Sequence, residues 1–276
     1  MAADSAHEMP ADQYVVTIAK YGTRNTVRSD VFLNYPVYHQ DDGPIQMDYF
    51  VWVLRNGERT IVVDTGFSRH GGAVRNRQML IDPPELFALL GVHPDDAPLV
   101  LITHAHFDHI GNLKHFPRSP MVLSEVEYRF WQGEHAQRAL FHHSVEDDEL
   151  VTLASLVNEG RVELFSGRRE VAPGVELVEL GGHTPGQSVV IVQTSDGPVL
   201  LASDAIHYYE EYEADMPFTS VADLVGMYDA FDTIRRMVAS GEVRHLVSGH
   251  DPATLERFAA VEGELAGFVA TIGAAA

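Results

Sequence analysis

Short apolar runs recur along this chain of 276 residues, separated by brief polar or glycine-containing stretches. Val175–Leu180 alternates apolar and polar residues as a half-buried strand does, whereas Leu99–Ile102 is apolar throughout, as in a fully buried strand. Asn56-Gly57 is a strong signal for a hairpin turn, and apolar runs flank it on both sides. The pattern predicts strands at residues 14–21, 49–54, 60–64, 99–102 and 121–123, and mostly strands from 161 to 203.

Three segments have helical signals instead. Pro83–Leu90 opens with two prolines and ends before a glycine, which is typical of a short helix. Ser124 is an expected N-cap for a helix through Trp131, with Glu127 at the third position of a capping box. Apolar residues at helical spacing predict a longer helix over Val221–Val238. Strands between these helical regions indicate an α/β fold with two sheets and helices outside.

Residues suited to metal binding directly follow four of the apolar runs. The richest group is His104-Ala105-His106-Phe107-Asp108-His109, which comes after Leu99–Ile102. Three further runs lead to His183, to Asp204 and to His250. Open α/β sheets commonly place their sites at strand ends, where loops project side chains from a rigid scaffold. The pattern therefore predicts a site at these strand ends.

Imidazole nitrogens and carboxylate oxygens are ligands that zinc and its divalent neighbours prefer. The side chains of His104, His106, Asp108 and His109 cannot all face one ion from a regular strand or helix, but a loop can divide them between two ions. The alternative is a histidine-rich surface loop, or histidines satisfied within the core. Four ligand-type residues within one short run favour the metal site.

In order and type, these segments resemble the metallo-β-lactamase superfamily, with His-x-His-x-Asp-His, then a distant His, an Asp and a last His. Ile61–Gly66 is also similar to the family's Asp-Thr-Gly turn. The resemblance covers residues 14–258 and implies an αβ/βα sandwich of two mixed β-sheets with flanking helices. It implies a two-metal centre in which Asp204 bridges two ions, one held by His104, His106 and His183 and the other by Asp108, His109 and His250.

The resemblance further implies that the cofactors are two divalent metal ions, Zn²⁺ first, with Fe, Mn or Co as alternatives. A water or hydroxide would form the second bridge. A centre of this charge lowers the pKa of bound water to about 7 and polarises a carbonyl oxygen. The implied reaction is hydrolysis by attack of the bridging hydroxide.

Within the superfamily, the chain is most similar to the N-acyl-homoserine lactonases and related lactonases. The supporting residues are Ser203-Asp204-Ala205, the helical stretch after it, and Gly249-His250-Asp251-Pro252. Class B β-lactamases lack the bridging Asp, and flavodiiron oxidoreductases carry Glu at the position of His106. The alternatives are a hydrolase of another small ester, thioester or cyclic amide, a mononuclear iron persulfide dioxygenase, and metal binding without turnover.

Well-known lactonases carry a Tyr three residues after the bridging Asp, where this chain has His207, followed by Tyr208. Tyr208 is the first choice for a side chain that assists the substrate and His207 the second, with packing at the rim as the alternative for both. Asp108 is expected to carry a proton to the leaving alkoxide as well as to bind metal. Five further residues are expected to line an apolar acyl pocket or to belong to the core: Met47, Tyr49, Phe50, Trp52 and Phe67.

The chain has 40 acidic and 19 basic residues, for a net charge of −21. This balance disfavours nucleic acid and acidic membranes as partners, because nucleic-acid binders carry a basic footprint. We expect a small, neutral, partly apolar substrate, and we allow for a homodimer. The lack of Cys excludes disulfides and thiolate ligands. With no long apolar span and no signal-peptide pattern, a cytoplasmic location is expected.

We expect a flexible N-terminal tail over residues 1–12 and a single domain over residues 13–276. Within that domain, Gly133–Glu149 departs from the core pattern and carries His135, His142 and His143. This segment is predicted to be either a lid over the metals or a solvated helical excursion. Because seven ligands already fill two sites, His142 and His143 are not expected to bind metal.

Overall fold

A computed structural model describes residues 10–57 and 59–274 of the chain. Residues 1–9 of the expected tail lie outside the described residues. At the start of the described chain, the carbonyl of Ala11 accepts a hydrogen bond from the side-chain amide of Asn56 at 3.0 Å. This contact joins residue 11 to the turn between two early strands.

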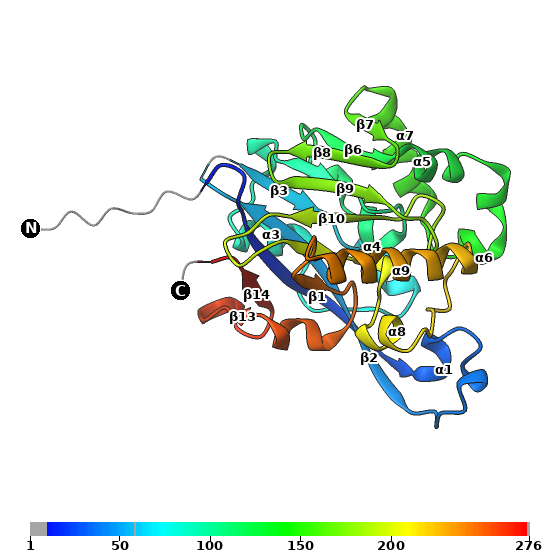
Figure 1. The fold of residues 1–276 in the computed structure, drawn as a ribbon. Coiled ribbons are helices and arrows are strands. Elements are labelled where there is room, and N and C mark those ends of the chain that lie inside the picture. The colour runs from blue at the N-terminus through cyan, green and yellow to red at the C-terminus, as the bar shows by residue number, and fades with distance from the viewer. Residues whose placement is uncertain (1–9, 58, 275–276) are drawn as a thin grey trace, which may run out of the picture.

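The described residues form two mixed β-sheets (Figure 1). The strands of the first sheet are β1 (Val15–Val27), β2 (Pro44–Arg55), β3 (Thr60–Val63), β4 (Gln78–Met79), β5 (Leu99–Leu101), β6 (Met121–Ser124), β7 (Val162–Phe165), β13 (Ala259–Ala260) and β14 (Val269–Ile272). The strands of the second sheet are β8 (Arg168–Ala172), β9 (Val175–Glu179), β10 (Ser188–Val192), β11 (Val199–Leu201) and β12 (His245–Val247).

Strand order makes both sheets mixed. The first runs β13-β14-β1-β2-β3-β5-β6-β7, with β4 paired to β1, and the second runs β12-β11-β10-β9-β8. Neighbours from β3 through β7 in the first sheet are parallel, as are β11 and β12 in the second. The carboxyl ends of β5 and β6 therefore lie at one edge of the first sheet, which is where ligands bind in open α/β sheets.

Short helices connect these strands. The α-helices are α1 (Arg28–Val31), α2 (Arg69–Val74), α3 (Pro83–Leu89), α4 (Phe107–Ile110), α5 (Glu125–Trp131), α6 (Ala139–His142), α7 (Asp147–Asn158), α8 (Tyr209–Glu213) and α9 (Leu224–Ser240). The 3-10 helices are η1 (Tyr35–Tyr38), η2 (Pro94–Asp96), η3 (Leu113–His115), η4 (Glu134–Gln137), η5 (Ser203–Ala205), η6 (Pro252–Arg257) and η7 (Gly263–Leu265). In the described part of the chain, none of the helices has the length and apolar character that crossing a membrane requires.

Apolar side chains fill three layers. Between the sheets, Trp52 of β2 packs in one cluster with Leu177 of β9. On the outer face of the second sheet, Phe231 of α9 packs with Ile191 of β10, and Figure 1 shows α9 lying across that sheet. Leu153 of α7 belongs to the cluster that covers the other face of the first sheet. Each such side chain contributes about 1.5–3 kcal/mol of burial free energy. The αβ/βα sandwich expected from the resemblance is confirmed.

The local signals in the sequence correspond to observed turns and caps. β2 and β3 form the expected antiparallel hairpin, with Arg55 opposite Thr60. The Ser124 hydroxyl caps α5 by accepting from the Glu127 amide at 3.2 Å. The long C-terminal helix begins at Leu224, three residues later than expected, because the Asp223 carboxylate accepts from the first free amides of the helix.

Candidate metal centre

Four strand ends deliver the predicted ligand residues. After β5, His106 stands at the N-cap position of α4, whose single turn carries Asp108 and His109. After β11, Ser203 has a φ of 47°, in the left-handed region that ordinary residues seldom adopt, and this bend starts the turn that contains Asp204. Gly249 passes so close to this turn that a Cβ there would lie 2.5 Å from the Ser203 carbonyl oxygen. Only glycine fits at this point.

The seven predicted ligands come together in two groups. One contains His104, His106, His183 and Asp204, and the other contains Asp108, His109 and His250. Within each group the ligand atoms lie within 4.8 Å of one another, and the exposed fraction of every one of the seven residues is 7% or less. The division between two groups is the one that the sequence motif implies.

Asp204 faces both groups. Its Oδ2 lies 3.4 Å from His183 Nε2 and 3.8 Å from His104 Nε2. Its Oδ1 lies 3.3 Å from His109 Nε2 and 3.1 Å from His250 Nε2. One carboxylate oxygen therefore points at each group, which is the geometry that a bridging ligand requires.

The donor atoms fit divalent cations. Among the described residues, the Nε2 atoms of His104, His109 and His250 are buried without a hydrogen-bond partner, and so is Asp204 Oδ1. Buried polar atoms are rarely left unsatisfied without a reason. Because these atoms converge, metal ions would supply the missing partners. The residues present therefore fit a two-metal centre.

Hydrogen bonds at the far side of the rings orient three of these histidines. The Nδ1 atoms of His183 and His250 donate to the carbonyls of Ser220 and Asp48, each at 2.7 Å. His109 Nδ1 lies 2.8 Å from the Asp64 carboxylate. A proton on Nδ1 leaves Nε2 with a free lone pair that points into the site. Asp64 belongs to the Asp-Thr-Gly turn of the sequence motif, which explains the function of that turn.

Three histidines of the first group are held in the neutral form that metal binding needs. Burial lowers the pKa of His104 and of His106 well below the usual value, and neighbouring imidazoles add to the effect. Burial likewise lowers the pKa of His183 to about 3. His106 Nδ1 and His183 Nε2 are 3.0 Å apart. Two neutral nitrogens at this distance can act as two ligands of one ion.

The function of the Glu127 side chain is not apparent from the sequence. It is fully buried and does not reach back to Ser124, as a capping box would require. Instead Oε1 accepts from the Ala105 amide at 2.9 Å and from Trp131 Nε1 at 2.7 Å, and Oε2 accepts from the Gly186 amide at 3.0 Å. Glu127 thus joins the loop of the first two histidines to the loop that follows His183.

Of the two side chains proposed to assist the substrate, the structure brings only His207 to the metal ligands. His207 Nε2 lies 3.1 Å from Asp204 Oδ2, and Nδ1 lies 3.1 Å from Glu211 Oε2. Burial lowers the pKa of His207, but Glu211 and Asp204 outweigh this effect and raise the pKa to about 9. The Tyr208 hydroxyl instead donates to the carbonyl of Gln46 at 3.1 Å.

A pocket of about 140 Å³ opens onto the ligands, and His106, Asp108, His183 and Asp204 line it. Of the aromatic residues and Met expected at an acyl pocket, Met47 and Tyr49 line this one. Phe50 and Trp52 belong to the core between the sheets, and Phe67 packs edge-on against Tyr21 and Tyr49. These three residues therefore lie in the core, which was the alternative to the acyl pocket.

The segment Gly133–Glu149 lies beside this pocket. His143 and Ser144 line the pocket, and Figure 1 shows α6 at the end of the molecule to which β9 points. Arg75 fastens the segment, since its guanidinium donates to the carbonyls of His143 at 2.7 Å and of Val145 at 2.9 Å. Neither His142 nor His143 belongs to the two ligand groups found among the described residues.

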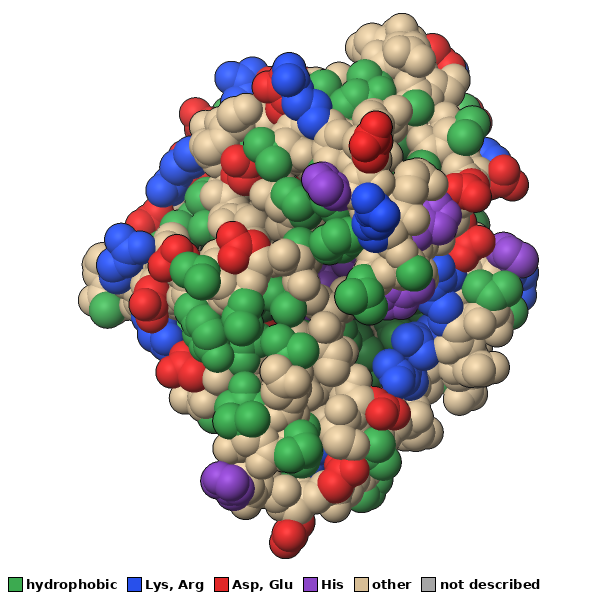
Figure 2. Space-filling model, turned by 90° about the vertical axis from the view of Figure 1, so that its right-hand side faces the viewer, with side chains coloured by type: hydrophobic (Ala, Val, Ile, Leu, Met, Phe, Trp, Pro, Cys, Tyr) green, Lys and Arg blue, Asp and Glu red, His purple; other side chains and the backbone are tan. Residues whose placement is uncertain are grey.

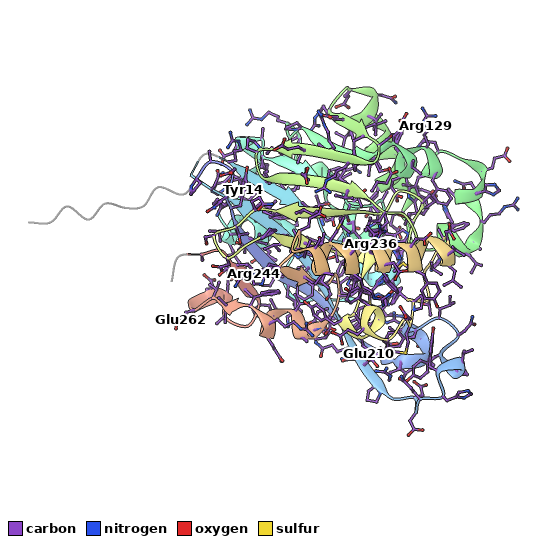
Figure 3. All side chains as sticks on the ribbon, viewed as in Figure 1. Tyr14, Arg129, Glu210, Arg236, Arg244 and Glu262 are labelled. Carbon is purple, nitrogen blue, oxygen red and sulfur yellow. The ribbon has the colours of Figure 1, made fainter. Side chains whose placement is uncertain are left out.

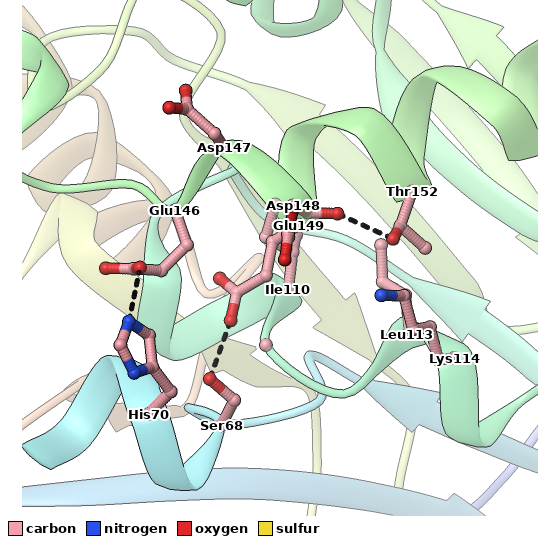
Figure 4. A pocket seen from close by; sticks show the side chains of 11 residues that line it. Ser68, His70, Ile110, Leu113, Lys114, Glu146, Asp147, Asp148, Glu149 and Thr152 are labelled. Atoms are coloured by element: carbon pink, nitrogen blue, oxygen red, sulfur yellow. Dashed lines mark hydrogen bonds and ion pairs between the residues drawn. The ribbon is translucent and has the colours of Figure 1, made fainter.

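A larger hollow of about 400 Å³ lies between α2, α4 and α7, and none of the seven ligands lines it (Figure 4). Ser68 donates to the Glu149 carboxylate there at 2.8 Å. Burial raises the pKa of Glu149 to about 7. The hollow has an acidic lining, because Glu146, Asp147 and Asp148 line it together with Glu149. This lining distinguishes the hollow from the pocket over the metal ligands.

Comparison with known proteins agrees with this geometry. Residues 47–250 match the Metallo-beta-lactamase superfamily, and the matched span contains all seven ligand residues. The chain belongs to this superfamily.

Two of the curated relatives that the chain resembles within this superfamily are N-acyl homoserine lactonases. The chain is 30% identical to an N-acyl homoserine lactonase of a Bacillus species over 226 residues, which cover 74% of this chain and 82% of the relative. It is 32% identical to the N-acyl homoserine lactonase AiiB of Agrobacterium fabrum over 193 residues, 67% of each protein.

Two solved structures share the fold. A quorum-quenching N-acyl homoserine lactone lactonase superposes with a TM-score of 0.72 at 23% identity, over 88% of this chain and 94% of that one. AidC, a dizinc quorum-quenching lactonase, superposes with a TM-score of 0.68 at 17% identity over 97% of both chains.

Proposed function

We propose that this protein is a metal-dependent hydrolase that opens the ester ring of lactones similar to N-acyl-homoserine lactones. The observation that carries the proposal is Asp204, whose two carboxylate oxygens face separate groups of ligands. Such a shared carboxylate suits hydrolysis at a two-metal centre. The relatives at 30% and 32% identity, both named N-acyl homoserine lactonases, support the substrate class.

Zinc is the metal that we propose for both positions, with iron, manganese and cobalt as alternatives. Imidazole and carboxylate donors suit all four metals, so the donor set alone does not choose among them. When bound, two such ions polarise the ester carbonyl and lower the pKa of a bound water to about 7. Five histidines and two carboxylates would hold them: His104, His106, His183, Asp204, Asp108, His109 and His250.

Asp108 has a second task in the proposed reaction. Ring opening releases an alkoxide, which needs a proton before the product leaves. The Asp108 carboxylate lines the pocket, and 6% of the residue is exposed there. A carboxylate in this place can take the proton that the attacking water loses and pass it to the alkoxide.

Of the two candidates, His207 is the one that we propose to support the reaction. The Tyr208 hydroxyl is held by its hydrogen bond to the Gln46 carbonyl. Neither Tyr208 nor His207 belongs to the lining of the pocket, so neither is proposed to contact the substrate. His207 instead acts through Asp204, as a positioning residue. Because Glu211 fixes the far side of its ring, His207 holds the shared carboxylate in one orientation.

The proposed acyl site is a hollow next to the metal pocket. The two share His143, Thr219 and Ser220. The hollow measures about 520 Å³, and Leu140 and Phe141 of α6 contribute to its lining. A partly apolar acyl group would lie there while the lactone ring lies over the metals. The lid interpretation of Gly133–Glu149 fits this arrangement.

The deciding experiment is a substrate panel on the zinc-loaded protein. We would measure kcat/KM for a lactone series with acyl chains, matched thioesters and matched cyclic amides, together with metal content by elemental analysis. Two equivalents of metal and preferred opening of the lactones are the expected result. Preferred thioester or amide cleavage would move the assignment to another hydrolase. A single bound iron with no hydrolysis would leave the dioxygenase alternative.

A further inference from the structure

The pocket over the metal ligands is basic, although the chain has a net charge of −21. Arg24, Arg75 and Arg77 line it, and its lining carboxylates are those of the ligands Asp108 and Asp204. Figure 2, which views the molecule from the end where α6 lies, shows basic side chains beside histidines at a hollow. A cleft lined by one sign of charge concentrates ligands of the opposite sign. The local charge therefore indicates an anionic ligand.

Arg75 is already engaged within the protein. Its guanidinium forms an ion pair with Glu146 at 2.5 Å and lies 4.2 Å from the centre of the Phe107 ring. It also donates to the carbonyls of the segment that it fastens. These contacts use its charge and most of its donors, so Arg75 serves the structure of the lid.

The pairing of β1 with β4 places Arg24 and Arg77 side by side. β1 and β4 are antiparallel, with Gly22 opposite Met79 and Thr23 opposite Gln78. Continuing this register by one step sets Arg24 opposite Arg77, with both side chains on the same face. Burial lowers the pKa of Arg24, and the charge of Arg77 lowers it further. Like charges opposite each other on a sheet are destabilising.

Within the described chain this pair is only partly neutralised, because Asp30 raises the pKa of Arg24 by less than Arg77 lowers it. Arg24 donates to the Thr26 hydroxyl at 3.0 Å, and Arg77 donates to the Arg75 carbonyl at 2.6 Å. Among the described residues, neither guanidinium forms an ion pair, since no carboxylate oxygen lies within 4.0 Å of its nitrogens. Arg77 Nε is buried and has no hydrogen-bond partner there. The two guanidiniums are crowded together and still have free donors. The planar geometry of these donors matches an oxyanion such as a carboxylate.

We propose that Arg24 and Arg77 form an anion subsite, and that the substrate carries a carboxylate remote from the ester that is cleaved. The pair and the metal ligands line the same pocket, so one small molecule can contact both. The expected substrate thereby changes from a neutral to an acidic lactone, whose acyl carboxylate would lie at the Arg24–Arg77 pair rather than in the hollow beside α6. The ring-opening part of this inference rests on the proposed function, whereas the anion subsite does not.

Binding of ring-opened compounds tests the subsite without turnover. We would titrate the zinc-loaded protein calorimetrically with N-succinyl-L-homoserine and with N-butanoyl-L-homoserine, which differ in the distal carboxylate. Since hydrogen bonds between charged groups are the strong ones, the succinyl compound should bind at least about tenfold more tightly. Arg24→Gln and Arg77→Gln should each remove most of that preference. Arg24→Lys keeps the charge without the planar fork and should retain part of it.

Arg236→Gln is the matched control, because Arg236 is an exposed residue of α9 outside the pocket lining (Figure 3). It removes the same charge and should leave the preference intact. Thermal unfolding of each variant would show that the fold is retained. Equal binding of the two compounds by the unmodified protein, or a preference that survives both pocket substitutions, would overturn the subsite.

Kinetics separate this inference from the proposed function. The acidic lactone, N-succinyl-L-homoserine lactone, should have a kcat/KM at least about tenfold above that of the butanoyl lactone. If both lactones are opened equally well, the lactonase proposal stands and the acidic substrate fails. If neither is opened but the binding preference depends on Arg24 and Arg77, the lactonase proposal fails and the anion subsite stands.

Discussion

Glu127→Gln should weaken both the fold and the metal site, although it changes one atom. The carboxylate accepts three hydrogen bonds, from the amides of Ala105 and Gly186 and from the Trp131 indole. An amide side chain has one acceptor oxygen, and its NH₂ group would face an N–H donor. Either the loop before His106 or the loop after His183 then loses its partner.

The size of the effect follows from these contacts. A hydrogen bond to a charged group contributes about 1.5–3 kcal/mol, and at least one of the three is lost. The others weaken because the acceptor becomes neutral. Burial raises the pKa of Glu127, so removing the charge returns part of the desolvation cost. We expect a net destabilisation of about 2–4 kcal/mol.

Urea unfolding of the zinc-loaded protein, followed by circular dichroism, measures the stability change. Competition with a zinc chelator measures affinity, which should fall about tenfold to a hundredfold, as for other residues that orient metal ligands. Glu125→Gln is the control, since Glu125 lies on the same helix, is partly exposed and pairs with Arg129. If the two variants unfold at the same urea concentration and bind zinc equally well, Glu127 does not join the two loops as argued.

Four further substitutions test separate parts of the structure. Asp108→Asn should lower lactone turnover by at least about a hundredfold, as expected when a general acid–base group is lost; near-normal turnover with both metals bound would remove Asp108 from the proton transfer. His207→Gln should reduce zinc affinity in a chelator competition by about tenfold, whereas Tyr208→Phe should leave affinity and turnover unchanged; the reverse result would return the assisting part to Tyr208. Burial raises the pKa of Glu149 from 4.5 to about 7, so the folded state keeps a proton that the unfolded state has lost and stability falls as the pH rises through this range. Glu149→Gln should remove about 2 kcal/mol of that loss, measured by urea unfolding at pH 5 and pH 8; identical pH profiles for both proteins would show that this carboxyl group is not buried as described.

The sequence alone was enough to predict the fold class and the seven residues that the structure gathers into two candidate metal-binding groups. Each ligand follows an apolar run, and a strand followed by a turn is a local pattern that apolar periodicity and glycine reveal. The hairpin at Asn56 and the cap at Ser124 are equally local, since a few neighbouring residues determine them. The family resemblance supplied the order of the ligands, and the geometry around Asp204 agrees with it.

What only the tertiary structure decided depends on residues far apart in the chain. Glu127 has the sequence signature of a helix start, yet its carboxylate bonds to Gly186, 59 residues away. The sequence favoured Tyr208 over its neighbour His207, yet packing turns the His207 ring to Asp204 and the Tyr208 hydroxyl to Gln46. The Arg24–Arg77 pair depends on the register of β4, a two-residue strand too short to leave a periodic signal. Periodicity shows which face a residue takes within its own element, whereas the partner across a gap depends on how the elements pack.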